Sequence, residues 1–175
     1  MTNESLISAL NEALDMEKKG HAFYEEMSKK STNDITKKTF SFLKDNEILH
    51  IDNIKAFYET LKRDGKVPAF NSDAFKTERR NEYTIFRERL SSLKDKIKPK
   101  DDDKKACEFA MDFENKGYKH YEKMLKRAKD ANLIKLLKFL LEEEANHYES
   151  IKKTYEYLTD SANWFMFEEG SFPQG

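Results

Sequence analysis

Cysteine is almost absent from this sequence, and proline and glycine are scarce. The 175 residues include one Cys, three Pro and five Gly. A single thiol, Cys107, excludes an intrachain disulfide and a metal site built from several cysteines, and we expect it to be a small core residue. With so few helix-breaking residues, the chain can form long helices. No apolar run approaches the roughly 20 residues that a membrane span requires.

An excess of charge of one sign is also missing, because 32 Lys and Arg residues balance 33 Asp and Glu residues. The net charge of −1 gives no reason to expect a nucleic-acid or membrane partner. The first residues, Met1 to Glu4, lack the basic and apolar parts of a signal peptide, so we expect a cytoplasmic protein. Charged residues make up 37% of the chain and hydrophobic residues 38%, a mixture typical of amphipathic helices with solvated outer faces.

Two stretches of the chain share one spacing of Glu and His. Glu47 precedes His50 by three residues, and Glu144 precedes His147 by three. On a helix this spacing places both side chains on one face, about one turn apart. Each pair interrupts an apolar stripe, formed by Phe40, Leu43, Ile54, Phe57 and Leu61 in the first copy and by Leu137, Leu140, Ile151, Tyr155 and Leu158 in the second. Unpaired charges are costly in such a position, so the pattern indicates a bound metal ion.

The first half of the chain repeats in the second half without gaps. The shift is 97 residues, the distance from His50 to His147. Other matched pairs are Ala13 and Ala110, Glu17 and Glu114, Gly20 and Gly117, Tyr24 and Tyr121, Phe42 and Phe139, and Leu61 and Leu158. A repeated unit of about 55 residues is a helix pair rather than a solenoid repeat. Two such hairpins joined by a long connection predict an all-α four-helix bundle with one crossover.

Helix start and stop signals divide the chain into one domain, residues 1–160, and an aromatic tail, residues 161–175. We expect hairpins over 4–63 and 102–160, joined by a crossover over 64–101. Within them the signals predict helices over 4–30, from about 34 to Arg63 with Gly65 as the cap, from about 101 to 129, and from a turn at 130–132 to about 160. We also expect an intervening helix near 83–97. The basic residues of the crossover are expected to form a solvated face, namely Arg79, Arg80, Arg87 and Arg89. The tail is expected to dock on the bundle or on a partner.

Antiparallel pairing brings two further carboxylates level with the Glu-x-x-His motifs. Counted from a turn near Thr32, Glu17 lies about as far before the turn as Glu47 lies after it. The same count around a turn near Asp130 places Glu114 level with the second motif. Six groups therefore converge, namely Glu17, Glu47, His50, Glu114, Glu144 and His147. Two imidazoles cannot neutralise four carboxylates, which argues against buried ion pairs alone, whereas two divalent cations balance them.

These six residues resemble the ligand set of the ferritin-like di-iron carboxylate family, and within it the rubrerythrin type. The resemblance covers residues 5–61 and 102–158. It implies a ferritin-like bundle that binds two irons, other divalent metals being possible, with Glu47 and Glu144 bridging. It also implies a non-haem di-iron oxidoreductase that reduces hydrogen peroxide or dioxygen, and we expect a homodimer.

Two departures from the rubrerythrin pattern affect the expected chemistry. Full rubrerythrins carry a rubredoxin domain with paired cysteines, which this chain lacks, so electrons are expected from an external donor such as a rubredoxin-like protein. At Gly117 the rubrerythrin pattern has an extra Glu that exchanges with a His during the redox cycle. Two other functions use the same six residues: a ferroxidase or iron-handling protein, and a partner-binding bundle whose metal is structural.

Four further residues lie near the expected site. Tyr24 and Tyr121 face inward, and we favour core packing for them over hydrogen bonding to the ligands. His21 lies one turn from Glu17 and is a candidate for contact with a ligand, but its counterpart in the second half is not a His. His120 is not expected to bind metal, because its counterpart is an aromatic residue.

Overall fold

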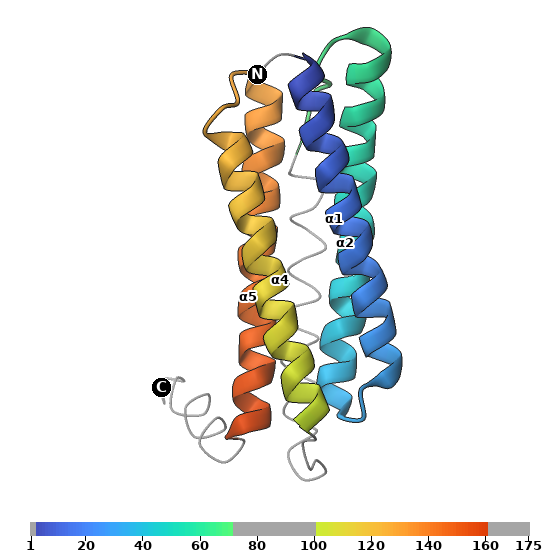
Figure 1. Ribbon diagram of the computed structural model, residues 1–175, viewed down its shortest axis with the longest axis vertical. Helices are drawn as coiled ribbons and strands as arrows, with labels where there is room; N and C mark the ends of the chain where they lie inside the picture. The colour runs from blue at the N-terminus through green and yellow to red at the C-terminus, as the bar shows by residue number, and fades with distance from the viewer. Residues whose placement is uncertain (1–2, 72–100, 161–175) are drawn as a thin grey trace, which may run out of the picture.

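The computed structural model describes residues 3–71 and 101–160. These residues form four helices, which are α1 (Asn3–Lys30), α2 (Asp34–Asp64), α4 (Asp101–Leu125) and α5 (Ala131–Thr159). Figure 1 shows α1 and α2 as one antiparallel hairpin and α4 and α5 as a second, packed side by side with their axes nearly aligned. The prediction of an all-α, ferritin-like four-helix bundle built from two hairpins is confirmed.

The turn of the first hairpin follows its sequence signals closely. The Asn33 side chain accepts hydrogen bonds from the backbone N–H groups of Ile35 and Thr36, which caps the start of α2. At the other end of α2, Gly65 has a φ of 66°, a left-handed conformation that glycine adopts without steric cost. Its N–H donates to the carbonyl of Leu61, as expected for a C-terminal cap.

The turn of the second hairpin comes earlier than predicted. Helix α4 ends at Leu125, not near 129, because the chain tightens through a bond from the Arg127 N–H to the Met124 carbonyl. Asp130 then caps α5 by accepting from the backbone N–H groups of Asn132 and Leu133. The predicted turn at 130–132 is therefore already the start of the next helix.

The bundle core consists of two apolar clusters at opposite ends of the helices. One cluster lies at the start of α1 and α5 and the end of α2 and α4, and includes Leu10, Phe57, Leu61, Leu136 and Leu137. The other lies at the opposite ends and includes Ile35, Phe40, Leu43, Cys107 and Ile151. Cys107 is fully buried, as expected. The level between the clusters, in the middle of every helix, is occupied by polar side chains.

The prediction that Tyr155 faces the apolar interior is wrong. Tyr155 is only partly buried, and its hydroxyl donates to the exposed carboxylate of Glu108 at 2.8 Å. Thr154 and Tyr157 occupy the interior instead. Residue 154 is the repeat counterpart of Phe57, which is buried, so the register of the first hairpin already indicates the correct position.

Several predictions fall on residues outside the described ranges. They are the helix near 83–97, the solvated arginines at 79, 80, 87 and 89, and the docking of the tail at 161–175. Among the helices that the structure describes, none is both long enough and apolar enough to span a bilayer.

Candidate metal centre

The six predicted ligands meet at the middle level of the bundle. Each side chain extends inward from the central part of its helix, and each residue is at most 3% exposed. The first hairpin contributes Glu17 from α1 with Glu47 and His50 from α2, and the second contributes Glu114 from α4 with Glu144 and His147 from α5. Burial of so many ionisable groups in one layer requires compensation within the layer.

The six side chains fall into two half-sites. In one, donor atoms of Glu17, His50 and Glu144 all lie within 4.8 Å of one another. In the other, the same holds for donor atoms of Glu114, His147 and Glu144. Each half-site thus combines a Glu from α1 or α4 with the His of a Glu-x-x-His motif, as the repeat predicts.

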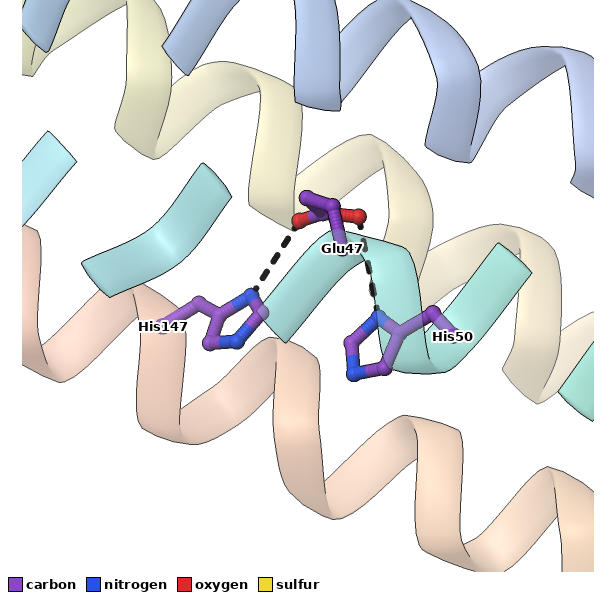
Figure 2. Close-up of side chains that lie close together, drawn as sticks. All are labelled: Glu47, His50 and His147. Carbon is purple, nitrogen blue, oxygen red and sulfur yellow. Dashed lines mark ion pairs between the residues drawn. The ribbon is translucent and has the colours of Figure 1, made fainter. Parts of the chain in front are cut away.

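Two carboxylates are shared between the half-sites. Figure 2 shows Glu47 between the two imidazoles, with its oxygens 3.7 Å from His50 Nδ1 and 3.4 Å from His147 Nδ1. Glu144 belongs to both of the donor groups described above. These are the positions that bridging ligands would occupy, and they come from equivalent places in the two repeats.

Both imidazoles present their Nδ1 atoms to the carboxylates. His50 Nδ1 lies 3.1 Å from Glu17, and His147 Nδ1 lies 3.6 Å from Glu114. The two rings are stacked, with centroids 5.1 Å apart and an angle of 15° between their planes. The Phe139 and His50 rings pack edge to face, with centroids 6.1 Å apart and an angle of 83° between their planes, so packing as well as charge orients the imidazole.

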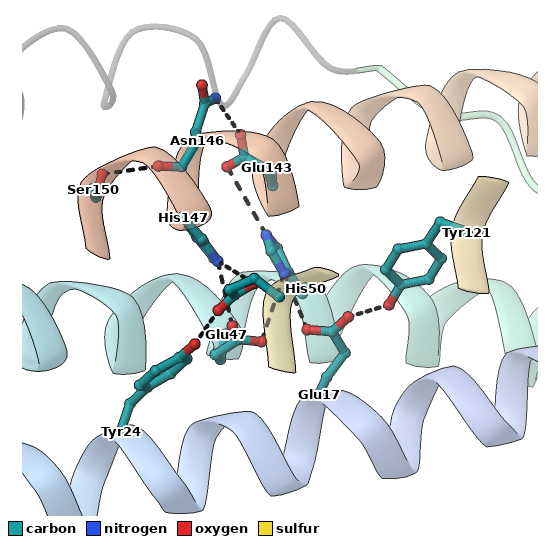
Figure 3. Close-up of polar contacts among 10 residues, drawn as sticks. Glu17, Tyr24, Glu47, His50, Tyr121, Glu143, Asn146, His147 and Ser150 are labelled. Carbon is teal, nitrogen blue, oxygen red and sulfur yellow. Dashed lines mark hydrogen bonds and ion pairs between the residues drawn. The ribbon is translucent and has the colours of Figure 1, made fainter. Parts of the chain in front are cut away.

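The two inward tyrosines form crossed hydrogen bonds between the hairpins. The Tyr24 hydroxyl of α1 donates to Glu114 of α4, and the Tyr121 hydroxyl of α4 donates to Glu17 of α1. Figure 3 shows Tyr121 reaching Glu17 and Tyr24 pointing into the polar layer. The preference for core packing alone was therefore wrong. Burial leaves each phenol in need of a partner, and the carboxylate of the opposite hairpin meets that need.

Two glycines allow the shared carboxylates to lie close to the neighbouring helices. A Cβ atom on Gly117 would lie 3.1–3.3 Å from the Glu144 carboxyl group. A Cβ atom on its counterpart Gly20 would lie 3.4 Å from Glu47 and only 2.8 Å from the Phe113 ring. The missing side chain of Gly117 thus leaves space for Glu144, whereas that of Gly20 leaves space mainly for the Phe113 ring. At Gly117, an added Cβ requires the Glu144 carboxyl group to shift by a few tenths of an ångström.

Glu143 is a further buried carboxylate that the sequence argument did not identify. Its residue is 7% exposed, and its Oε2 lies 3.9 Å from Nε2 of His50 (Figure 3). It does not belong to the repeat pattern, because its counterpart in the first half is Asn46. The neighbouring Glu144 held the inward position in the helical count, so periodicity gave no signal for Glu143. His21 and His120 belong to none of the metal-holding groups among the described residues.

The four carboxylates divide into two pairs with opposite shifts of pKa. Burial raises the pKa of Glu47 to about 8, and the negative charge of Glu17 adds to that shift. Burial also acts to raise the pKa of Glu17, but a hydrogen bond from Glu47 and the charge of His50 outweigh it and lower the pKa to about 2. In this pair Glu47 therefore holds a proton and Glu17 is ionised.

The second pair repeats this arrangement. Burial and the charge of Glu114 raise the pKa of Glu144 well above its usual value. Burial alone would raise the pKa of Glu114 as well, but a hydrogen bond with Glu144 and the charge of His147 lower it. For His147, burial lowers the pKa and the charge of Glu114 raises it, with a net result of about 9. The pKa of His50 is also raised, because Glu17 and Glu143 outweigh burial.

The donor atoms of this layer fit metal ions better than they fit one another. Buried atoms without a hydrogen-bond partner among the described residues include Glu47 Oε2, Glu114 Oε2 and both nitrogens of His147. Buried polar atoms are normally paired, so these atoms indicate a missing partner. Carboxylate oxygen and imidazole nitrogen suit manganese, iron and zinc. Two dications would balance the charge of four ionised carboxylates.

Comparisons with known proteins agree with this geometry. A family model described as Rubrerythrin matches residues 8–155. No curated protein matches the chain. Among solved structures, a hypothetical protein from Pyrococcus furiosus superposes with a TM-score of 0.65 at 19% identity, over 91% of this chain and 97% of the other. At that identity the likeness shows the fold alone.

Proposed function

Because this chain belongs to the rubrerythrin family, we propose that it is a non-haem di-iron oxidoreductase that reduces hydrogen peroxide or dioxygen. The observation that carries the proposal is the buried layer of four Glu and two His, arranged as two half-sites with two shared carboxylates. This set matches the ligands of di-iron carboxylate bundles in type and number.

Each half-site would hold one iron. Glu17 and His50 would bind the first, and Glu114 and His147 would bind the second. Glu47 and Glu144 would contribute to both, since each lies against both half-sites. Other divalent ions fit the same donors, and iron is proposed because it is the metal typical of the family.

The side chains around the layer would hold the ligands in place and exclude water during redox chemistry. When bound, the iron pair would supply two electrons to the O–O bond of the oxidant. Tyr24 and Tyr121 hold the outer carboxylates in place through their hydroxyl groups. The apolar clusters above and below the layer exclude bulk water, which strengthens every electrostatic interaction inside it.

Repeated turnover would need an external electron donor. The sequence has one cysteine, which is buried and whose pKa burial raises to about 12, so it offers no second redox centre of the cysteine-ligated kind. We propose a one-electron carrier such as a rubredoxin-like protein as the donor. We also propose that the chain is a cytoplasmic protein. We further propose a homodimer rather than a mineral-storing cage, because the two hairpins are joined in one duplicated chain.

Iron reconstitution followed by rapid mixing tests the proposal. We expect about two irons per chain, faster oxidation of the ferrous protein by peroxide or dioxygen than of free ferrous ion, and turnover when a rubredoxin-like donor is supplied. Glu144→Ala should lose at least one iron, whereas Glu149→Ala, an exposed Glu on the same helix, should lose none.

Two results would contradict the proposal. A wild-type chain that binds no metal after reconstitution would remove its basis. A large particle that accumulates hundreds of irons, without turnover from any donor, would instead assign the chain to iron storage. Size measurement by light scattering separates this second case from the small assembly that we propose.

A further inference from the structure

The two half-sites differ at the far side of their imidazoles. Nε2 of His50 faces the Glu143 carboxylate at 3.9 Å, within ion-pair distance but longer than a direct hydrogen bond. The other oxygen of Glu143 accepts a hydrogen bond of 3.5 Å from the Asn146 side chain. Figure 3 shows this group reaching His50 from α5, the neighbouring helix of the other hairpin.

The Nε2 atoms of both histidines are buried and have no hydrogen-bond partner among the described residues. Within that part of the chain, a carboxylate lies within ion-pair distance of Nε2 for His50, at Glu143, and not for His147. The repeat counterpart of Glu143 is Asn46, an uncharged residue on α2. The two repeats thus supply the same ligands but surround them differently.

This difference matters once a metal binds. An imidazole that binds metal through Nδ1 must carry its proton on Nε2, and that N–H needs an acceptor when it is buried. A carboxylate in that position fixes the tautomer and the ring orientation and strengthens the ligand. Glu143 is placed to serve His50 in this way, whereas among the described residues no carboxylate is placed to serve Nε2 of His147.

We propose that Glu143 is a positioning residue for His50 and makes the Glu17–His50 half-site the tighter of the two metal sites. This inference rests on the proposed metal centre and adds an order of loading to it. The first metal ion enters the half-site of Glu17 and His50, and the second enters that of Glu114 and His147. The asymmetry comes from one residue, because the ligands themselves repeat.

Cobalt(II) binding to single-histidine variants of the full chain tests the inference without any turnover. In a His147→Ala background, which keeps the Glu17–His50 half-site, Glu143→Gln should weaken cobalt binding about 10- to 100-fold, the usual effect of losing such a contact. In a His50→Ala background the same change should alter binding less than about threefold. Gln keeps the volume of Glu and one acceptor oxygen, so the comparison reports mainly on the loss of the charge.

A second measurement keeps all six ligands and decides the matter where a single-histidine variant binds no cobalt. In the otherwise unchanged chain, Glu143→Gln should weaken the first of two stepwise cobalt constants. Asn46→Glu, which places a carboxylate at the repeat-equivalent position, should strengthen the second. Both changes should appear in the visible absorption of the bound cobalt as a loss of the two-step titration.

The possible failures can be told apart. If the wild type binds two cobalt ions and Glu143→Gln leaves both constants unchanged, the inference is overturned and the proposed function stands. Equal weakening in the His50→Ala and His147→Ala backgrounds would also overturn it, because the effect would then be general rather than directed at His50. If the wild type binds no divalent metal, the proposed function and the inference fall together.

Discussion

Metal binding should release protons from the polar layer near neutral pH. Without metal, burial and a neighbouring carboxylate raise the pKa of Glu47 to about 8 and raise that of Glu144 as well, which favours their protonated forms. The carboxylate partners of the two histidines outweigh burial, so the pKa of His147 rises to about 9 and that of His50 also rises. Ligands must lose these protons to bind metal. Exchange of protons for dications limits the change in the charge of the layer, so the desolvation cost of the layer stays low.

The expected number follows from the shifted pKa values. At pH 8 the Glu47 carboxyl, with a pKa of about 8, is half protonated, and His147, with a pKa of about 9, is nine-tenths protonated. Glu47 and His147 alone therefore release about 1.4 protons at pH 8, and Glu144 and His50, whose pKa values are also raised, add to that number. Side chains with ordinary values of 4.5 for Glu and 6.5 for His would release almost none at this pH.

Calorimetry provides the assay. Zinc is titrated into the metal-free protein at pH 8 in two buffers with different enthalpies of ionisation, and the difference in heat gives the number of protons released. Exposed-site variants such as Glu149→Ala should give the wild-type number. Release of fewer than about one proton for two bound ions would refute the account, because the ligands would then not be held protonated by burial.

Three further predictions concern stability and the residues around the layer. Glu47 titrates at about 8 in the folded chain and near 4.5 when unfolded, so the folded state binds the extra proton between these values. The free energy of unfolding of metal-free protein should therefore fall as pH rises from 5 to 8, by about 1.4 kcal/mol per pH unit for this proton. Thermal melts should show this fall in stability, and bound zinc should abolish the dependence on pH. Gly117→Ala should weaken zinc binding, because the added Cβ presses on Glu144. Gly117→Glu should recover the affinity for zinc through its added carboxylate. In stopped-flow measurements, the ferrous form of Gly117→Glu should also react faster with peroxide than that of Gly117→Ala. Tyr121→Phe should raise the pKa of Glu17, whose ionised form the hydroxyl stabilises, and weaken zinc binding at low pH, as calorimetry would detect.

The fold and the placement of the six polar side chains were predictable because the sequence states them twice. Each Glu-x-x-His motif alone is weak, but two copies in one register, each level with an inward Glu, define which faces meet. The helix ends with clear caps, at Asn33 and Gly65, were also predictable, since the capping residue fixes the geometry locally.

Features that depend on contacts between the hairpins were harder to predict. The direction of the Tyr24 and Tyr121 hydroxyl groups depends on which helix lies opposite, and helical periodicity gives only the inward face. Glu143 lies next to the predicted ligand Glu144, and its contact with His50 depends on the packing of α2 against α5. The early end of α4 reflects competition between extending this helix and capping the next helix at Asp130. Helix propensities alone do not show which of the two is more stable.

The crossed tyrosine bonds have the form of contacts across a twofold axis. Tyr24 of the first hairpin bonds to Glu114 of the second, and the equivalent Tyr121 of the second bonds to the equivalent Glu17 of the first. Contacts between two identical subunits related by a twofold axis have the same reciprocal form. The chain can thus be regarded as a symmetric dimer of one hairpin whose two copies became a single polypeptide. Identical subunits cannot carry Glu143 in one copy and Asn46 in the other. Fusion into one chain would therefore allow two sites with the same ligands to acquire different affinities.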